Sequence, residues 1–207
     1  MTRTRIKVCG ICSSADAEHA IAAGADAIGL VFYSQSARYI PVSTARDIAN
    51  HIPPFASTVG LFVNSDHQEV CNVLSEVPLD LLQFHGDEDE EFCNSFSRPY
   101  IKAVRVKEDT DLLQVCRQYE SARGILLDSF KKGVRGGTGE TFDWSLIPES
   151  LPLPVVLAGG LDASNVAMAV SRVHPWAVDV SSGVEHSPGK KDNQKIVHFI
   201  KAVESIR

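Results

Sequence analysis

The chain has 207 residues, of which 44% are hydrophobic, and it carries a formal net charge of −6. This length and apolar content suffice for one hydrophobic core, so we predict a single domain over residues 1–207. The acidic balance argues against nucleic acid binding, because a phosphate backbone selects for clustered Lys and Arg. No apolar run approaches the roughly 20 residues that span a bilayer, and no signal-peptide pattern follows Met1. Five cysteines without a repeating spacing predict free thiols and a cytosolic location.

Short apolar, β-branched runs alternate with polar segments of helical length along the whole chain, which is typical of repeated βα units and a parallel sheet. The predicted strands lie near 5–9, 27–32, 58–63, 79–84, 101–106, 124–128, 154–158 and 177–180. The predicted helices lie near 14–23, 43–51, 68–77, 87–96, 110–119, 143–147, 163–173 and 193–206. Eight such units predict a (β/α)8 TIM barrel, whereas a doubly wound open sheet usually has fewer strands and places its glycine fingerprint after the first one.

Two hydrophobic runs in the last quarter of the chain break into Gly and Ser, at 157–161 and 179–185. Backbone N–H groups crowd around an anion only where side chains are short or absent. In parallel βα barrels the loops after strands seven and eight, with a short extra helix, usually build such a phosphate site. The predicted phosphate ligands are Gly159, Gly160, Ser181, Ser182 and Gly183. The alternative is that these glycines simply make tight turns between strand and helix.

Reactive groups in a βα barrel stand at the carboxyl ends of the strands. Alternation along the first strand turns Cys9 toward the barrel mouth, and the same rule places Asp128 on the inner face of the sixth strand. A thiol and a carboxyl facing one space predict a general base and a general acid, and Lys7 on the face of Cys9 favours the thiolate. The alternatives are a small buried thiol and an aspartate that caps a turn.

Three further polar residues are candidates for substrate binding. Arg38, in the loop after the second strand, is placed to clamp a carboxylate, unless it is only a surface charge. His85 is expected to hydrogen-bond at the rim and not to shuttle protons. Asp179 points inward, where it serves either the substrate or a salt bridge to Lys7.

The motifs that carry a family resemblance run in order along nearly the whole chain. They are the segments 7–10 (KVCG), 38–39, 83–86 (QFHG), 128–129, 136–139 (GGTG), 142–144, 157–161 with Asn165, 179–185 and 189–192. Together they resemble phosphoribosylanthranilate isomerase, an enzyme of tryptophan biosynthesis. The cysteine and the aspartate at those two strand ends make the set specific.

The resemblance implies a cofactor-free and metal-free Amadori rearrangement of N-(5-phosphoribosyl)anthranilate to 1-(2-carboxyphenylamino)-1-deoxyribulose 5-phosphate. It implies that Asp128 protonates the furanose ring oxygen and that Cys9 removes the C2 proton. Arg38 would hold the anthranilate carboxylate, and the glycine-rich loops would hold the phosphate. The expected partner is this small phosphosugar, and the expected assembly is a monomer or a weak homodimer.

One position departs from the family pattern, because Cys12 stands where the family typically carries a residue without a thiol. Cys-x-x-Cys between a strand and a helix is also the shape of a dithiol redox site, so an oxidoreductase is an alternative. That alternative leaves the late glycine-rich turns and Asp128 unexplained. If the sulfurs of Cys9 and Cys12 approach each other, mild oxidation is expected to inactivate the protein reversibly; otherwise Cys12 packs into the core.

Two other readings keep the barrel. The analogous isomerase of histidine biosynthesis carries Asp where Cys9 stands and binds a substrate with two phosphates, whereas this chain has one glycine-rich pair. A barrel that only binds phosphosugars would not need Cys9 and Asp128. The segment from Ser129 to Phe142, rich in Gly and Lys, is the one long interruption and is expected to act as an active-site lid.

Overall fold

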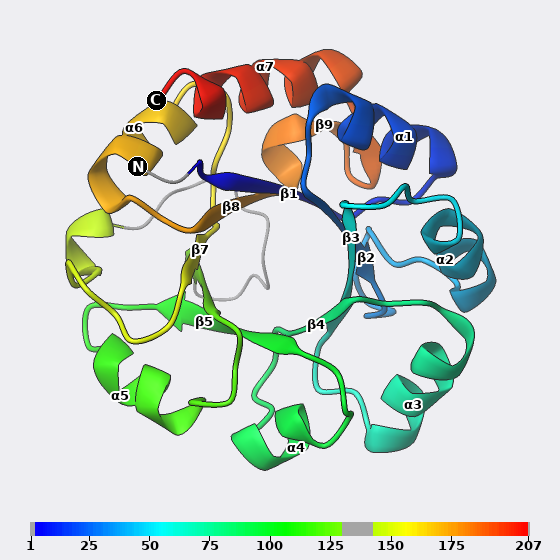
Figure 1. Ribbon diagram of the computed structural model, residues 1–207, viewed down its shortest axis with the longest axis horizontal. Coiled ribbons are helices and arrows are strands. Elements are labelled where there is room, and N and C mark those ends of the chain that lie inside the picture. The colour runs from blue at the N-terminus through cyan, green and yellow to red at the C-terminus, as the bar shows by residue number, and fades with distance from the viewer. Residues whose placement is uncertain (1–2, 130–142, 207) are drawn as a thin grey trace.

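The computed structural model describes residues 3–129 and 143–206. In these ranges eight parallel strands pair in sequence order and close into a barrel, as predicted (Figure 1). The strands are β1 (Arg5–Cys9), β2 (Ala27–Val31), β3 (Ser57–Phe62), β4 (Leu81–Phe84), β5 (Tyr100–Val106), β6 (Ile125–Ser129), β7 (Val155–Leu157) and β8 (Ala177–Val180). Pairing of β8 with β1 closes the ring, with Lys7 in register with Asp179.

Helices surround the barrel on the outside (Figure 1). They are α1 (Ser14–Ala23), α2 (Val42–Ala49), α3 (His67–Glu76), α4 (Glu90–Asn94), α5 (Leu112–Gln118), α6 (Val166–Val173) and α7 (Asn193–Glu204). After β8 the chain forms a short 3-10 helix, η2 (Ser182–Val184), and a small antiparallel hairpin of β9 (Glu185–Ser187) and β10 (Lys190–Lys191). The extra helix after the eighth strand is therefore present.

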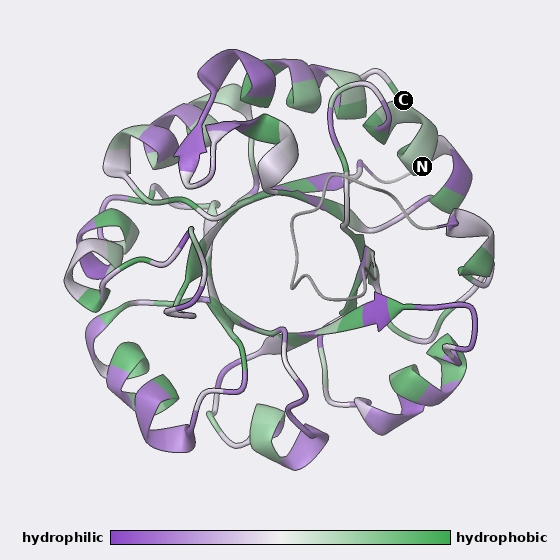
Figure 2. Cartoon of the chain, turned by 180° about the vertical axis from the view of Figure 1, so that it is seen from behind, coloured by the Kyte–Doolittle hydropathy of each residue, from purple (hydrophilic) through white to green (hydrophobic). Residues whose placement is uncertain are grey.

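Side chains alternate across the barrel wall as the strand pattern predicts. Ile6 and Val8 of β1 belong to the large core between strands and helices. Inside the barrel, Leu126 belongs to one smaller apolar cluster and Cys9 to another. In Figure 2 hydrophobic colour dominates the strands, whereas the helices carry both hydrophobic and hydrophilic residues. The inner cluster around Cys9 is completed by Val31 and Leu61, which places the thiol against apolar groups.

Several described helices differ from their predicted bounds; α4, predicted over 87–96, is Glu90–Asn94. Two of the differences have a visible cause. The predicted helix over 143–147 is a 3-10 helix, η1 (Trp144–Leu146), in which the Asp143 side chain accepts a hydrogen bond from the Ser145 N–H at 2.9 Å. Helix α6 begins at Val166 and not at 163, because the Asp162 carboxylate accepts a hydrogen bond from the Ser164 N–H and holds a turn ahead of the helix.

The predicted lid from Ser129 to Phe142 lies, from residue 130 onward, outside the described residues. Across the described ranges, none of the helices has the length and apolar character that crossing a bilayer requires.

Candidate active site

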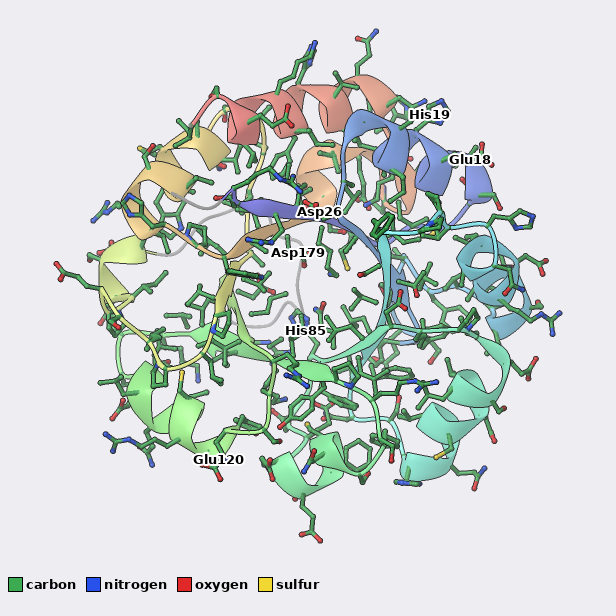
Figure 3. All side chains as sticks on the ribbon, viewed as in Figure 1. Glu18, His19, Asp26, His85, Glu120 and Asp179 are labelled. Atoms are coloured by element: carbon green, nitrogen blue, oxygen red, sulfur yellow. The ribbon has the colours of Figure 1, made fainter. Side chains whose placement is uncertain are left out.

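A cavity of about 550 Å³ opens at the carboxyl ends of the barrel strands. Its lining includes nine of the ten predicted site residues: Cys9, Arg38, His85, Asp128, Gly159, Gly160, Asp179, Ser181 and Ser182. Figure 3 shows His85 and Asp179 inside the ring of strands, whereas Glu18, His19 and Glu120 lie outside it. Gly183, the tenth, lines no part of this cavity; a Cβ there would overlap the Leu161 carbonyl oxygen, so its role is to let two loops meet.

Cys9 ends β1 and is 4% exposed, beside a buried ion pair. The Lys7 ammonium lies 2.8 Å from the Asp179 carboxylate, which is the salt bridge that the sequence offered as one of two roles for Asp179. Burial by itself would lower the pKa of Lys7, but Asp179 and Cys9 outweigh burial and raise it. Gly29 of β2 leaves room for the thiol, since a Cβ there would lie 2.7 Å from Cys9 Sγ.

Burial and two charged neighbours act in opposite directions on the Cys9 thiol. Burial raises the pKa of the Cys9 thiol above its usual value; Lys7 lowers it, Asp179 raises it, and the net shift is upward. Lys7 therefore favours the thiolate, as predicted, but it is shared with Asp179 and does not overcome desolvation. The thiol form of Cys9 dominates at neutral pH.

Asp128 lies on β6 and is 7% exposed. Its Oδ2 is 3.2 Å from Nε2 of His85, which stands directly after β4. The other ring nitrogen of His85, Nδ1, lies 2.9 Å from the side-chain nitrogen of Gln83. His85 thus contacts the candidate acid, in agreement with a hydrogen-bonding role.

Arg38 makes a bidentate ion pair and is not a free surface charge. Its Nε and Nη2 each donate to one carboxylate oxygen of Glu185, both at 2.7 Å. Glu185 also accepts from the buried Lys191 ammonium at 3.0 Å. Burial would raise the pKa of Glu185, but the hydrogen bond from Arg38 and the charge of Lys191 lower it. The Glu185 carboxylate, whose charge is balanced by Lys191 and Arg38, therefore holds the Arg38 guanidinium at the cavity wall.

The two glycine-rich loops present polar groups that have no partner in the protein. Gly159 and Gly160 take positive φ values of 82° and 65°. Within the described residues, no protein acceptor meets their backbone N–H groups. The Ser181 hydroxyl is buried and also has no partner in this part of the chain. Because buried donors are normally satisfied, this arrangement indicates a ligand with several acceptor atoms.

Comparison with known proteins identifies the family. The family model of N-(5'-phosphoribosyl)anthranilate isomerase matches residues 6–202. The chain belongs to this isomerase family. A relative of this name from Pseudomonas savastanoi pv. phaseolicola is 57% identical over 203 residues, which is 98% of each chain.

Solved structures agree with the family. The phosphoribosyl anthranilate isomerase from Thermotoga maritima is 42% identical, with a TM-score of 0.88, and the match covers 98% of this chain and 99% of that one. The enzyme from Thermus thermophilus is 31% identical, with a TM-score of 0.88, over 99% of this chain and 100% of that one. Another structure, 42% identical with a TM-score of 0.85 over 98% and 99% of the two chains, is a complex with reduced 1-(o-carboxyphenylamino)-1-deoxyribulose 5-phosphate.

In this isomerase the Cys12 thiol is partly buried and contacts two backbone carbonyl groups. Its sulfur is 3.7 Å from the Gly10 carbonyl oxygen and 3.6 Å from that of Arg38, and burial raises the pKa of the thiol. All five cysteines are free.

Across the described ranges, no cluster of three or more His, Cys, Asp or Glu side chains is arranged to hold a metal ion.

Sequence reasoning missed three residues that shape the site of this isomerase. Gln83 lies in the motif 83–86, and Glu185 is the last residue of the motif 179–185, but neither was assigned a role from the sequence. Gly29 had no signal beyond a glycine inside a predicted strand, a pattern that often marks a close approach of a neighbouring group. The sequence around these three residues does not indicate which side chains they contact in the folded barrel.

Proposed function

We propose that this isomerase converts N-(5'-phosphoribosyl)anthranilate into 1-(2-carboxyphenylamino)-1-deoxyribulose 5-phosphate, the Amadori rearrangement of tryptophan biosynthesis, without a cofactor. The observation that carries the proposal is that one cavity brings together a thiol, a carboxyl, a guanidinium and two glycine-rich loops. Its volume of about 550 Å³ falls in the range of small-molecule sites. The ligand of the related complex is named as the reduced form of this product.

In the proposed reaction Asp128 acts first, as the acid. Its proton passes to the furanose ring oxygen, the bond from that oxygen to C1 breaks, and the anilino nitrogen lone pair forms a cationic iminium with C1. Each general acid or base step contributes roughly 10²- to 10⁴-fold in rate.

Cys9 acts second, as the base. The iminium acidifies the C2–H bond, and the Cys9 thiolate takes that proton while the bonding electrons form the C1–C2 double bond of an enolamine. The enolamine becomes the ketone when C1 gains a proton and the 2-hydroxyl loses one. Each turnover therefore moves one proton from Asp128 to Cys9, and one proton must return through solvent before the next.

The two ends of the substrate are held by the remaining groups. Arg38, oriented by Glu185, would donate to the anthranilate carboxylate. Gly159, Gly160, Ser181 and Ser182 would donate to the phosphate, and Gly183 would keep the two loops in contact. Asp179 would stand near the substrate nitrogen or the ribose hydroxyls while keeping its bond to Lys7.

The test is loss of anthranilate fluorescence when the purified protein meets the substrate. Asp128→Asn keeps the shape but removes the proton, so we expect kcat to fall by at least about 10²-fold, with product affinity changed by no more than a few-fold. Asp47→Asn, on the exposed face of α2, is the matched control and should turn over normally. A kcat within a few-fold of wild type in Asp128→Asn places the acid elsewhere.

We also infer that the protein works in the cytosol, which the five free thiols support. The assembly is proposed to be a monomer or a weak homodimer; one related protein, from Thermotoga maritima, is described as dimeric. Sedimentation at several concentrations distinguishes the two states.

A further inference from the structure

Gln83 is a fully buried polar residue with no part in the reaction described above. It lies on β4 with 0% exposure and faces the cavity from inside the barrel. Burying an amide costs free energy unless both of its polar atoms find partners. The contacts of Gln83 therefore bear on why an amide stands at this position.

The side chain of Gln83 begins a chain of contacts that ends at the candidate acid. Its Nε2 lies 2.9 Å from His85 Nδ1, and His85 Nε2 lies 3.2 Å from Asp128 Oδ2. An amide nitrogen donates and cannot accept, so Nδ1 is the acceptor in this contact. A neutral imidazole that accepts at Nδ1 carries its hydrogen on Nε2.

We propose that Gln83 is a positioning residue for the proposed acid step, holding His85 in the neutral tautomer with hydrogen on Nε2 so that His85 donates to Oδ2 of Asp128. This inference rests on the proposed function for the purpose of the contact, which is to orient the acid; the tautomer of His85 does not depend on the reaction. With Oδ2 accepting the His85 N–H, the proton of the acid form of Asp128 resides on Oδ1. Gln83 thus decides, through His85, which oxygen delivers the proton.

Two charged groups on neighbouring strands contact His85. Asp128 on β6 lies 3.2 Å from Nε2, and the Arg105 guanidinium on β5 lies 3.5 Å from the His85 carbonyl oxygen. An imidazolium would turn Nδ1 into a donor facing the donor of Gln83. The nearby Lys102 ammonium is already paired with Glu88 at 2.9 Å. The amide contact therefore selects the neutral ring.

The second atom of the amide argues against a purely stabilising role for Gln83. Within the described part of the chain, Gln83 Oε1 is buried and has no hydrogen-bond partner. Leaving a buried acceptor unsatisfied costs free energy that an apolar side chain of the same length would not lose. Retention of the amide despite this cost agrees with a role for its nitrogen in the site.

The experiment combines Gln83→Met, which removes the amide at similar volume, with 15N NMR of the imidazole ring in the ligand-free protein. His85→Asn assigns the ring signals. We expect wild-type His85 to be neutral with hydrogen on Nε2, and Gln83→Met to show the Nδ1-protonated form as well. We expect kcat of Gln83→Met to fall by up to about 100-fold, the scale of a misplaced reacting group, with KM within a few-fold and an unchanged or higher melting temperature. Gln68→Met, at an exposed glutamine of α3, is the control and should match wild type in every readout.

Three outcomes overturn the proposal: a wild-type ring with hydrogen on Nδ1, a Gln83→Met variant with wild-type kcat, or a loss of activity that only follows a loss of folding. The NMR measurement needs no substrate and no turnover. It therefore tests the tautomer even if the fluorescence assay refutes the proposed reaction, and the two failures can be told apart.

Discussion

At the scale of single residues, Cys9 combines two requirements that oppose each other. A base that abstracts a proton from carbon must be a thiolate, but the apolar wall around Cys9 favours the neutral thiol. Lys7 relieves this only in part because it also serves Asp179. The ligand-free site therefore holds its base mainly as the thiol.

We predict that the rate of Cys9 alkylation by iodoacetamide rises with pH and has its midpoint above 9.0, the ordinary pKa of a cysteine thiol. Only the thiolate reacts, so a raised pKa moves the rise in rate to higher pH. Peptide mass spectrometry follows Cys9 specifically, and the same cysteine in the denatured chain provides the reference. A midpoint in the native protein below that of the denatured chain would contradict the predicted balance.

Ser181 offers a second test at this scale, because its buried hydroxyl has no partner within the described residues. We expect Ser181→Ala to leave the free energy of unfolding unchanged or higher. We expect its affinity for the phosphorylated substrate to fall by about 1.5 to 3 kcal/mol, the value of a hydrogen bond to a charged group. Calorimetry with ribose 5-phosphate measures the loss, and Ser205→Ala at the end of α7 is the control. Equal affinities in the variant and wild type would remove Ser181 from the phosphate site.

At the scale of elements, the hairpin of β9 and β10 supports the loop after β2. Glu185 of β9 pairs with Arg38, and Lys191 of β10 pairs with the same Glu185 carboxylate. The Lys191 ammonium also donates to the Ser181 carbonyl oxygen at 3.2 Å, so the hairpin contacts the loop after β8 as well. Both proposed anchoring points of the substrate therefore depend on one small hairpin.

We predict that Glu185→Gln lowers the free energy of unfolding at pH 7 by about 3 kcal/mol, because it breaks a buried ion pair. This is the low end of the range for such pairs, since the Arg38 side chain is partly exposed. The folded-state pKa of Glu185 lies below its ordinary 4.5, so its stabilisation is present above pH 4.5 and is lost as pH falls through the folded pKa. The difference between variant and wild type should therefore shrink in acid. Urea unfolding at several pH values measures this. A difference that does not change with pH would show that the loss comes from packing and not from charge.

At the scale of the whole molecule, the barrel closes where β8 meets β1, and a buried ion pair lies on that seam. Lys7 and Asp179 are partners in the strand register, and their side chains are 6% and 8% exposed. Such a pair is costly to break because the remaining charge stays buried.

We expect Lys7→Met to destabilise the barrel by roughly 3 to 5 kcal/mol, since Asp179 is left unpaired in the interior. Lys7→Met with Asp179→Leu removes both charges and should recover most of that loss. Arg46→Met breaks the exposed pair with Glu76 and should cost less than about 1 kcal/mol. Denaturant unfolding compares the three variants with wild type. A double variant no more stable than Lys7→Met would mean that the ammonium packs and does not compensate charge.

The amino-acid sequence by itself determined the strand order, the barrel and the inward placement of Cys9 and Asp128. These features follow from local patterns: the alternation of strand and helix lengths, the period of two along a strand and the glycines after the last two strands. The helices near 143–147 and 163–173 were less predictable, because turns capped by Asp143 and Asp162 changed their type or start.

Only the tertiary structure decided which charges and hydrogen bonds meet in the site. Arg38 and Glu185 are 147 residues apart, and His85 and Asp128 are 43 apart. No local pattern encodes such pairs, because their distances depend on how eight strands tilt and close into a ring. The shift in the Cys9 pKa belongs to the same class, since it depends on burial and on a lysine shared across the seam between β1 and β8. The chain's local periodicity specifies which elements form, whereas closure of the barrel sets the electrostatics of its mouth.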